Sequence, residues 1–156
     1  MDAPGRKAPA MALRRMDNVL LVAEDLDAVL GFFLDLGMEL ENRGQLDWPG
    51  AERIVGLSGV RQTVAMLRVP DGPGRVEVVQ FQQPKAIAPQ PEQPPANTLG
   101  LRRMMFAVDD LDETLGRLRG HGAELVGTIE QYENVFRLCY VRGPENIVVG
   151  LAEELS

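Results

Sequence analysis

An internal repeat constrains the fold of this chain more than any other feature of its sequence. Residues 16–40 (MDNVLLVAEDLDAVLGFFLDLGMEL) and 101–125 (LRRMMFAVDDLDETLGRLRGHGAEL) align almost without gaps. The offset is 85 residues, from Asp25 to Asp110. This agreement of structural residues indicates an internal duplication. At the same offset Gly31 aligns with Gly116, Gly37 with Gly122, and Leu40 with Leu125.

Each half of the chain predicts the same order of elements. An apolar run typical of a buried strand comes first, at 19–23 and at 104–108. Asp25 in the first half, and Asp109 or Asp110 in the second, can cap a helix with apolar residues at helical spacing. Three strand-like segments follow each helix, which gives β-α-β-β-β twice. These segments start at Leu40, 61 and 75 in the first half and cover 123–131, 135–141 and 147–155 in the second.

Two segments lack such patterns and divide the chain. Residues 1–15 are rich in Pro, Ala, Gly and basic residues and are expected to form a mobile tail. Residues 82–97 contain five prolines, which block both helix and central strand, so we expect a linker. The prediction is a single α+β domain over 16–156, made of a module at 16–81, the linker, and a module at 98–156.

Composition excludes several classes of function. A chain of 156 residues with 45% hydrophobic and 25% charged residues suits one globular domain. Its net charge of -7 argues against a nucleic-acid partner, which usually meets a basic face. No run approaches the ~20 apolar residues of a membrane span, and no secretory signal is evident, so we expect a cytoplasmic protein. The single cysteine, Cys139, has apolar neighbours and is expected in the core.

The doubled strand-xDLD-helix pattern, the segment PDGPGRVEVVQF and the closing RGPENIVVGLAEEL resemble the vicinal oxygen chelate superfamily over residues 16–155. This superfamily includes glyoxalase I, methylmalonyl-CoA epimerase, extradiol dioxygenases, and the fosfomycin- and bleomycin-resistance proteins. The resemblance implies two βαβββ modules whose sheets curl around a shared cleft, usually in a homodimer. In metal-dependent members the cleft holds a divalent ion, bound by one residue of each first strand and a carboxylate of each last strand.

Carried over by position, those four ligand positions fall on Asn18, Glu77, Arg103 and Gly150. Only Glu77 is a good ligand, because Asn18 offers one neutral oxygen, Arg103 is a cation without a lone pair, and Gly150 has no side chain. His121, the only histidine, falls at a predicted helix end, where it caps the helix or faces solvent. We therefore expect no metal and no other cofactor.

The residues left at these positions allow two interpretations. Arg103 can neutralise a buried Glu77, with the Asn18 amide completing the cluster, and this pairing alone would hold the modules together. Alternatively, the cluster receives a polar group of a small ligand, with Arg103 as anion anchor and Glu77 as acceptor or general base. The sequence predicts that Arg103 and Glu77 meet in one chain or across a dimer, directly or through water or an anion.

Weaker candidates for ligand binding lie on a predicted loop and on predicted strands. Trp48 lies beside Pro and Gly in a loop and would cover a cleft or plug the core. The others are Arg61, Tyr132, Arg137 and Tyr140, although strand alternation puts about half of such residues on the wrong face.

Three functions stay open on this basis. The first is binding of a small organic molecule in a metal-free cleft. The second is a metal-independent isomerase, epimerase or lyase that uses Glu77 as base and Arg103 as anion anchor. The third is a metal-dependent enzyme of the glyoxalase, epimerase or dioxygenase type, which Arg103 and Gly150 disfavour.

Overall fold

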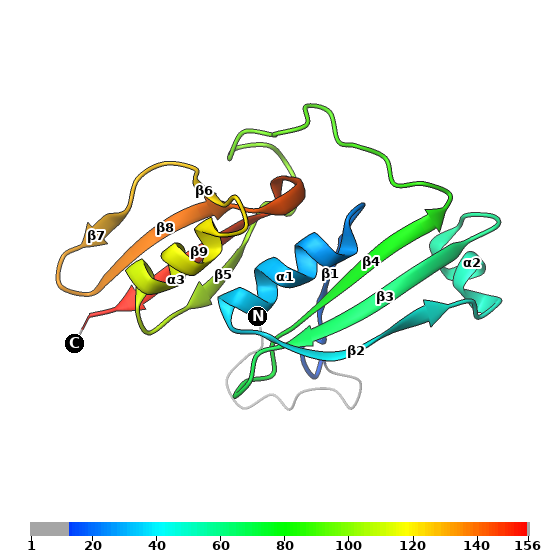
Figure 1. Ribbon diagram of the computed structural model, residues 1–156, viewed down its shortest axis with the longest axis horizontal. Coiled ribbons are helices and arrows are strands. Elements are labelled where there is room, and N and C mark those ends of the chain that lie inside the picture. The colour runs from blue at the N-terminus through cyan, green and yellow to red at the C-terminus, as the bar shows by residue number, and fades with distance from the viewer. Residues whose placement is uncertain (1–12, 156) are drawn as a thin grey trace, which may run out of the picture.

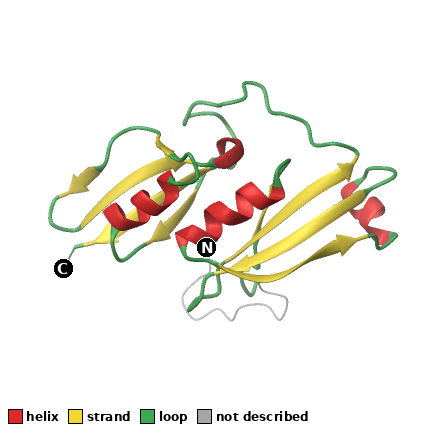
Figure 2. Cartoon of the chain, in the orientation of Figure 1, coloured by secondary structure: helices red, strands yellow, loops and turns green. Residues whose placement is uncertain are grey.

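The computed structural model describes residues 13–155 and contains two mixed β-sheets with helices between them (Figure 1). The predicted tail, 1–15, therefore lies outside the described residues except for 13–15. The same view coloured by element shows the extended linker that joins the two sheets at one side of the molecule (Figure 2). Among the described residues, no helix is long and apolar enough to cross a membrane.

The first sheet has the strand order β1-β4-β3-β2, with β1 parallel to β4 and the other neighbours antiparallel. The second has the order β5-β9-β8-β6, with β5 parallel to β9, and β7 pairs with β8. The first module comprises β1 (Val19–Val22), α1 (Leu26–Leu36), β2 (Glu39–Leu46), α2 (Gly50–Val55), β3 (Arg61–Arg68) and β4 (Arg75–Gln83). The second comprises β5 (Met104–Ala107), α3 (Leu111–Arg119), β6 (Glu124–Leu125), β7 (Glu130–Tyr132), β8 (Phe136–Arg142), the 3₁₀ turn η1 (Pro144–Asn146) and β9 (Val148–Glu154).

The predicted caps fix where α1 and α3 begin. The Asp25 carboxylate accepts from the backbone N–H of Ala28, and Asp110 does the same for Glu113. Gly37 ends α1 with φ 123°, a value that side-chain-bearing residues rarely adopt. The duplication therefore repeats capping chemistry as well as fold.

One core lies between the two sheets. Helices α1 and α3 contact each other, and Phe32, Phe33 and Leu118 on them are fully buried. Each sheet turns one side, its core face, toward these helices. On the opposite side, its open face, apolar side chains stay exposed: Leu20 on β1 is 48% exposed and Met105 on β5 is 51% exposed. A single chain thus buries one face of each sheet.

The structure departs from the predicted elements at two places. The segment predicted as a loop around Trp48 contains the short helix α2. The single strand predicted at 123–131 is two short strands, β6 and β7, that pair with different parts of β8. Of the predicted linker, 82–97, the first two residues extend β4, and residues 84–97 have no strand or helix and run on toward β5.

Candidate functional site

The strand registers place the four predicted ligand positions in equivalent pairs. In the first sheet Leu20 pairs with Glu77. In the second sheet Met105, which follows Leu20 by the 85-residue offset, pairs with Gly150. Glu77 and Gly150 therefore occupy the same place in the two modules, as do Asn18 and Arg103.

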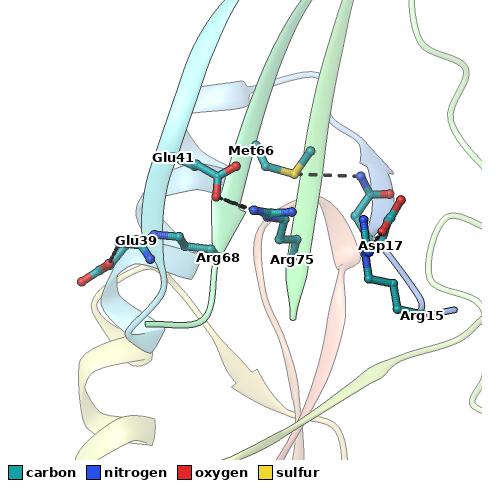
Figure 3. Close-up of polar contacts among 8 residues, drawn as sticks. Arg15, Asp17, Glu39, Glu41, Met66, Arg68 and Arg75 are labelled. Carbon is teal, nitrogen blue, oxygen red and sulfur yellow. Dashed lines mark hydrogen bonds and ion pairs between the residues drawn. The ribbon is translucent and has the colours of Figure 1, made fainter. Parts of the chain in front are cut away.

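A polar cluster lies on the open face of the first sheet. The Asn18 amide donates to the Glu77 carboxylate at 3.2 Å and contacts the Met66 sulfur at 3.9 Å. Figure 3 draws the second contact as the dashed line that ends on Met66, with the Glu41–Arg75 ion pair beside it. Glu77 is half-buried and has a fixed amide partner. The cluster can accept a hydrogen bond or a proton from a ligand.

The equivalent place in the second sheet has a different chemistry. The Arg103 guanidinium lies over the ring of Tyr140, 4.5 Å from its centroid. Tyr140 pairs with Gly150 as Met66 pairs with Glu77. A Cβ built on Gly150 would clash with the Met105 sulfur and lie 3.2 Å from Tyr140 Cδ1. The space of a carboxylate is therefore filled by a thioether and an aromatic ring.

Arg103 and Glu77 are not joined within one chain. The hydrogen bonds and ion pairs among residues 13–155 include none between them. The Asn18 amide donates to Glu77 in the first sheet, and Arg103 lies over the Tyr140 ring beside the second. A direct contact between Arg103 and Glu77 within one chain, one of the arrangements predicted from the sequence, is therefore not found among the described residues. A contact across a dimer, or through a bridging anion, stays a prediction.

These residues do not fit a divalent cation. Asn18 and Glu77 supply one neutral and one anionic oxygen donor, whereas catalytic ions take three or four protein donors. Across the described part of the chain, no group of three or more His, Cys, Asp or Glu side chains is arranged to hold a metal ion. Arg103 would repel the ion, and Gly150 offers no donor.

The weaker candidates are dispersed. Trp48 is 55% exposed and lies against Gly50, so it neither plugs the core nor covers either cluster. Arg61 lines a separate depression with Glu24 and Lys85. The structure thus brings neither of the two candidates into contact with Asn18 and Glu77.

The remaining candidates lie in the second module, where Tyr140 lies under the Arg103 guanidinium. Tyr132 stacks on Phe136, with ring centroids 5.6 Å apart, at the margin of the second sheet. Arg137 instead bonds Asp112 on α3, at 3.0 and 3.4 Å. This pairing turns Arg137 toward the helix, which corrects its assignment to the cleft. The His121 ring nitrogen Nε2 bonds the Asp35 carboxylate on α1, and Arg117 donates to the Asp35 carbonyl. Both residues therefore link the second module to the first.

Two arginines near Arg103 were not among the residues predicted from the sequence. Arg102 and Arg142 line the same cavity as Arg103, although they lie 40 positions apart in the chain. The doublet Arg102-Arg103 at a strand start was visible in the sequence, but only the fold brings Arg142 to it. Cys139 is buried as predicted, and burial raises the pKa of its thiol.

The chain is similar to known proteins in sequence and in fold. A glyoxalase family protein from Bacillus cereus is 47% identical, with a TM-score of 0.90 over 96% of this chain and 100% of that one. The trypanothione-dependent glyoxalase I of Leishmania major is 17% identical, with a TM-score of 0.61 over 91% of this chain and 88% of that one. The fosfomycin resistance protein FosX of Listeria monocytogenes is 12% identical, with a TM-score of 0.59 over 92% and 95%.

A search of curated protein sequences gave no significant match. The family model of the glyoxalase, bleomycin resistance protein and dioxygenase proteins matches residues 15–151, which is nearly the whole described chain. The doubled module, its strand order and this match agree, and the chain belongs to the Glyoxalase/Bleomycin resistance protein/Dioxygenase superfamily.

Proposed function

We propose that this member of the superfamily binds a small organic molecule in a metal-free cleft. The observation that carries the proposal is the pair of equivalent open-face clusters, Asn18–Glu77 in one sheet and Arg103–Tyr140 in the other. They offer a carboxylate acceptor, an amide, a cation and an aromatic ring, which suit a polar organic ligand better than a metal ion.

The cleft of this proposal is closed by a second copy of the chain. Each open face carries exposed apolar side chains around its polar cluster, including Leu20 and Met105. Pairing the first sheet of one chain with the second sheet of its partner would cover both faces and bring Glu77 toward the partner's Arg103. A homodimer with two such clefts is therefore part of the proposal.

One observation favours a second candidate, a metal-independent isomerase, epimerase or lyase. Glu77 is half-buried, and the Asn18 amide holds its carboxylate in a defined position. A carboxylate fixed in this way can accept a proton from a bound substrate, and Arg103 can stabilise the resulting anion. Turnover of an identified ligand separates this candidate from simple binding.

The test is a thermal-shift screen of small organic molecules and metabolites in the presence of EDTA. Ligands of the cleft should raise the Tm in EDTA, because binding to the folded state alone stabilises it. The shift should be lost in Asn18→Leu and reduced in Glu77→Gln. Glu113→Gln, which removes an exposed carboxylate on α3, is the matched control and should keep the full shift.

Two outcomes would count against metal-free binding. One is that every active compound stabilises the protein only when a divalent metal is added. The other is that Asn18→Leu and Glu77→Gln leave every shift unchanged, which would remove the cluster from the site. Conversion of a bound compound by the wild type, abolished in Glu77→Gln while binding persists, would select the enzymatic candidate.

A further inference from the structure

A cavity of about 230 Å³ lies where the two modules and the linker meet. Its walls come from β1, the linker, residues 101–104, β8 and the turn η1. Neither Asn18 nor Glu77 lines it, so the cavity is distinct from the cluster on the first sheet. Among its lining residues are Val19, Leu21, Arg102, Arg103, Tyr140 and Arg142.

The walls of this cavity are tied together by the turn η1. Asn146 accepts from the Gln93 side chain at 3.0 Å and donates to the Glu92 carbonyl at 3.2 Å, which fixes the linker. Glu145 accepts from the backbone N–H groups of Glu24 and Asp25 at the start of α1. Both turn residues have positive φ, 56° at Glu145 and 64° at Asn146, a conformation that residues other than glycine adopt uncommonly. The anchoring contacts hold this conformation, and they make the cavity a defined feature of the fold.

Three arginines line this cavity without a carboxylate partner. Arg102, Arg103 and Arg142 form no ion pair with any residue of the described chain. The Arg102 Nε and Arg142 Nη1 groups are buried and have no hydrogen-bond acceptor among residues 13–155. Burying such charged donors unpaired is unfavourable.

The cavity arginines differ in burial from the other unpaired arginines of the described chain. Six arginines pair with carboxylates on the surface, and Arg14, Arg53, Arg61 and Arg119 form no ion pair but are exposed, whereas the three cavity arginines are partly buried. Of the two glutamates that line the cavity, Glu145 is engaged by backbone N–H groups, and Glu92 is exposed. The three partly buried arginines therefore line a space that the carboxylates of the described chain leave to another anion.

We infer that this cavity is a binding site for a small organic anion, with a carboxylate or phosphate group held by Arg102 and Arg142. Guanidinium groups bind both anions through paired N–H donors. Val19, Leu21 and the Tyr140 ring supply an apolar wall for a short carbon skeleton. The volume limits the ligand to a small molecule, because sites for drug-sized ligands occupy roughly 300–1,000 Å³.

The experiment measures binding of inorganic phosphate and of succinate by calorimetry, in HEPES buffer at constant chloride concentration. Wild-type protein should bind at least one of them saturably, with one site per chain, and the stronger of the two identifies the anionic group. Arg102→Gln and Arg142→Gln should each weaken binding about tenfold or more, and Arg142→Lys should restore part of it. Arg119→Gln, which removes an exposed arginine at the end of α3, should leave binding unchanged.

Two further measurements keep the result interpretable. Glu77→Gln should bind the anion as the wild type does, so failure of the cleft proposed above and failure of this site are distinguishable. The Nε–H signal of Arg102 in the ¹⁵N spectrum of wild-type protein should shift on titration, which requires no variant to fold. The inference is overturned by absence of saturable binding of both anions, by an unmoved Arg102 signal, or by equal weakening in Arg119→Gln.

Discussion

Arg137 shows how a single ion pair decides the role of a strand residue. The sequence places it on a strand next to the predicted cleft, but its guanidinium bonds both oxygens of Asp112 at the start of α3. The hydrogen bonds from Arg137, and then its charge, lower the pKa of the Asp112 carboxyl. The same contacts raise the pKa of Arg137, which stays charged throughout the pH range in which proteins fold.

This pair should produce a defined pH dependence of stability. Because the Asp112 pKa is lower in the folded chain than the ordinary ~3.9 of the unfolded chain, its contribution is complete above that value. The contribution is lost as the pH falls through the lower, folded value. Arg137→Gln should therefore reduce the free energy of unfolding by a constant amount between pH 5 and 8, measured by urea titration at roughly unit pH steps. The difference from wild type should shrink below about pH 4. A difference that is the same at pH 3 and pH 7 would contradict this assignment.

At the scale of elements, the duplication supplies a matched pair of helix glycines. Gly31 in α1 and Gly116 in α3 occupy equivalent positions. A Cβ added at Gly31 would lie 3.1 Å from Cε1 of His121, whereas one added at Gly116 meets nothing within 4 Å. Close approach of the two modules thus requires glycine in only one of the copies.

Alanine at these two positions should separate helix propensity from packing. Gly116→Ala should stabilise the protein by about 0.5–1 kcal/mol, because alanine favours the helix and the site is open. Gly31→Ala gains the same propensity but pushes on His121, so its net effect should be smaller or destabilising. Urea unfolding of both variants measures the difference, and the pair Gly31→Ala with His121→Ala should recover the lost part. Equal stabilisation by both single variants would show that the His121 ring moves away from the new Cβ at no cost in free energy.

The sequence predicted the elements whose signals are local and missed those that depend on distant contacts. Asp25 and Asp110 act within the first turn of their helices, so the starts of α1 and α3 were predicted where they are observed. Helix α2 follows Trp48 and Pro49, whose turn-like composition masked it. The equivalence of Glu77 and Gly150 was implied by the family resemblance and agrees with the strand registers. The partners of Arg103 and Arg137 could not be predicted, because strand alternation gives two faces and only the tertiary packing selects one.

At the scale of the whole molecule, the two modules share a core on one side and leave the other side of each sheet open. Leu21 and Phe106 pack against the core, whereas their neighbours Leu20 and Met105 are about half exposed. An apolar sheet face of this kind is usually covered in a soluble protein. The polar residues Glu77 and Arg103 lie on these two faces, one on each, so covering the faces also completes the proposed cleft.

The protein should therefore sediment as a homodimer, at twice the 17.1 kDa mass of the chain, at micromolar concentration. Leu20→Lys and Met105→Lys should each shift the equilibrium toward monomer, because a lysine on a covered apolar face must lose its hydration. Their circular dichroism should stay that of the wild type, since both side chains are exposed within a single chain. Ile54→Lys is the control, because Ile54 is 72% exposed on α2, outside the open faces, and this variant should remain dimeric. A monomeric wild type, or a dimer that withstands both open-face lysines, would mean that the faces are not joined in this way.

The dimeric wild type should also retain the thermal shifts that the two lysine variants lose, because each cleft takes one cluster from each chain.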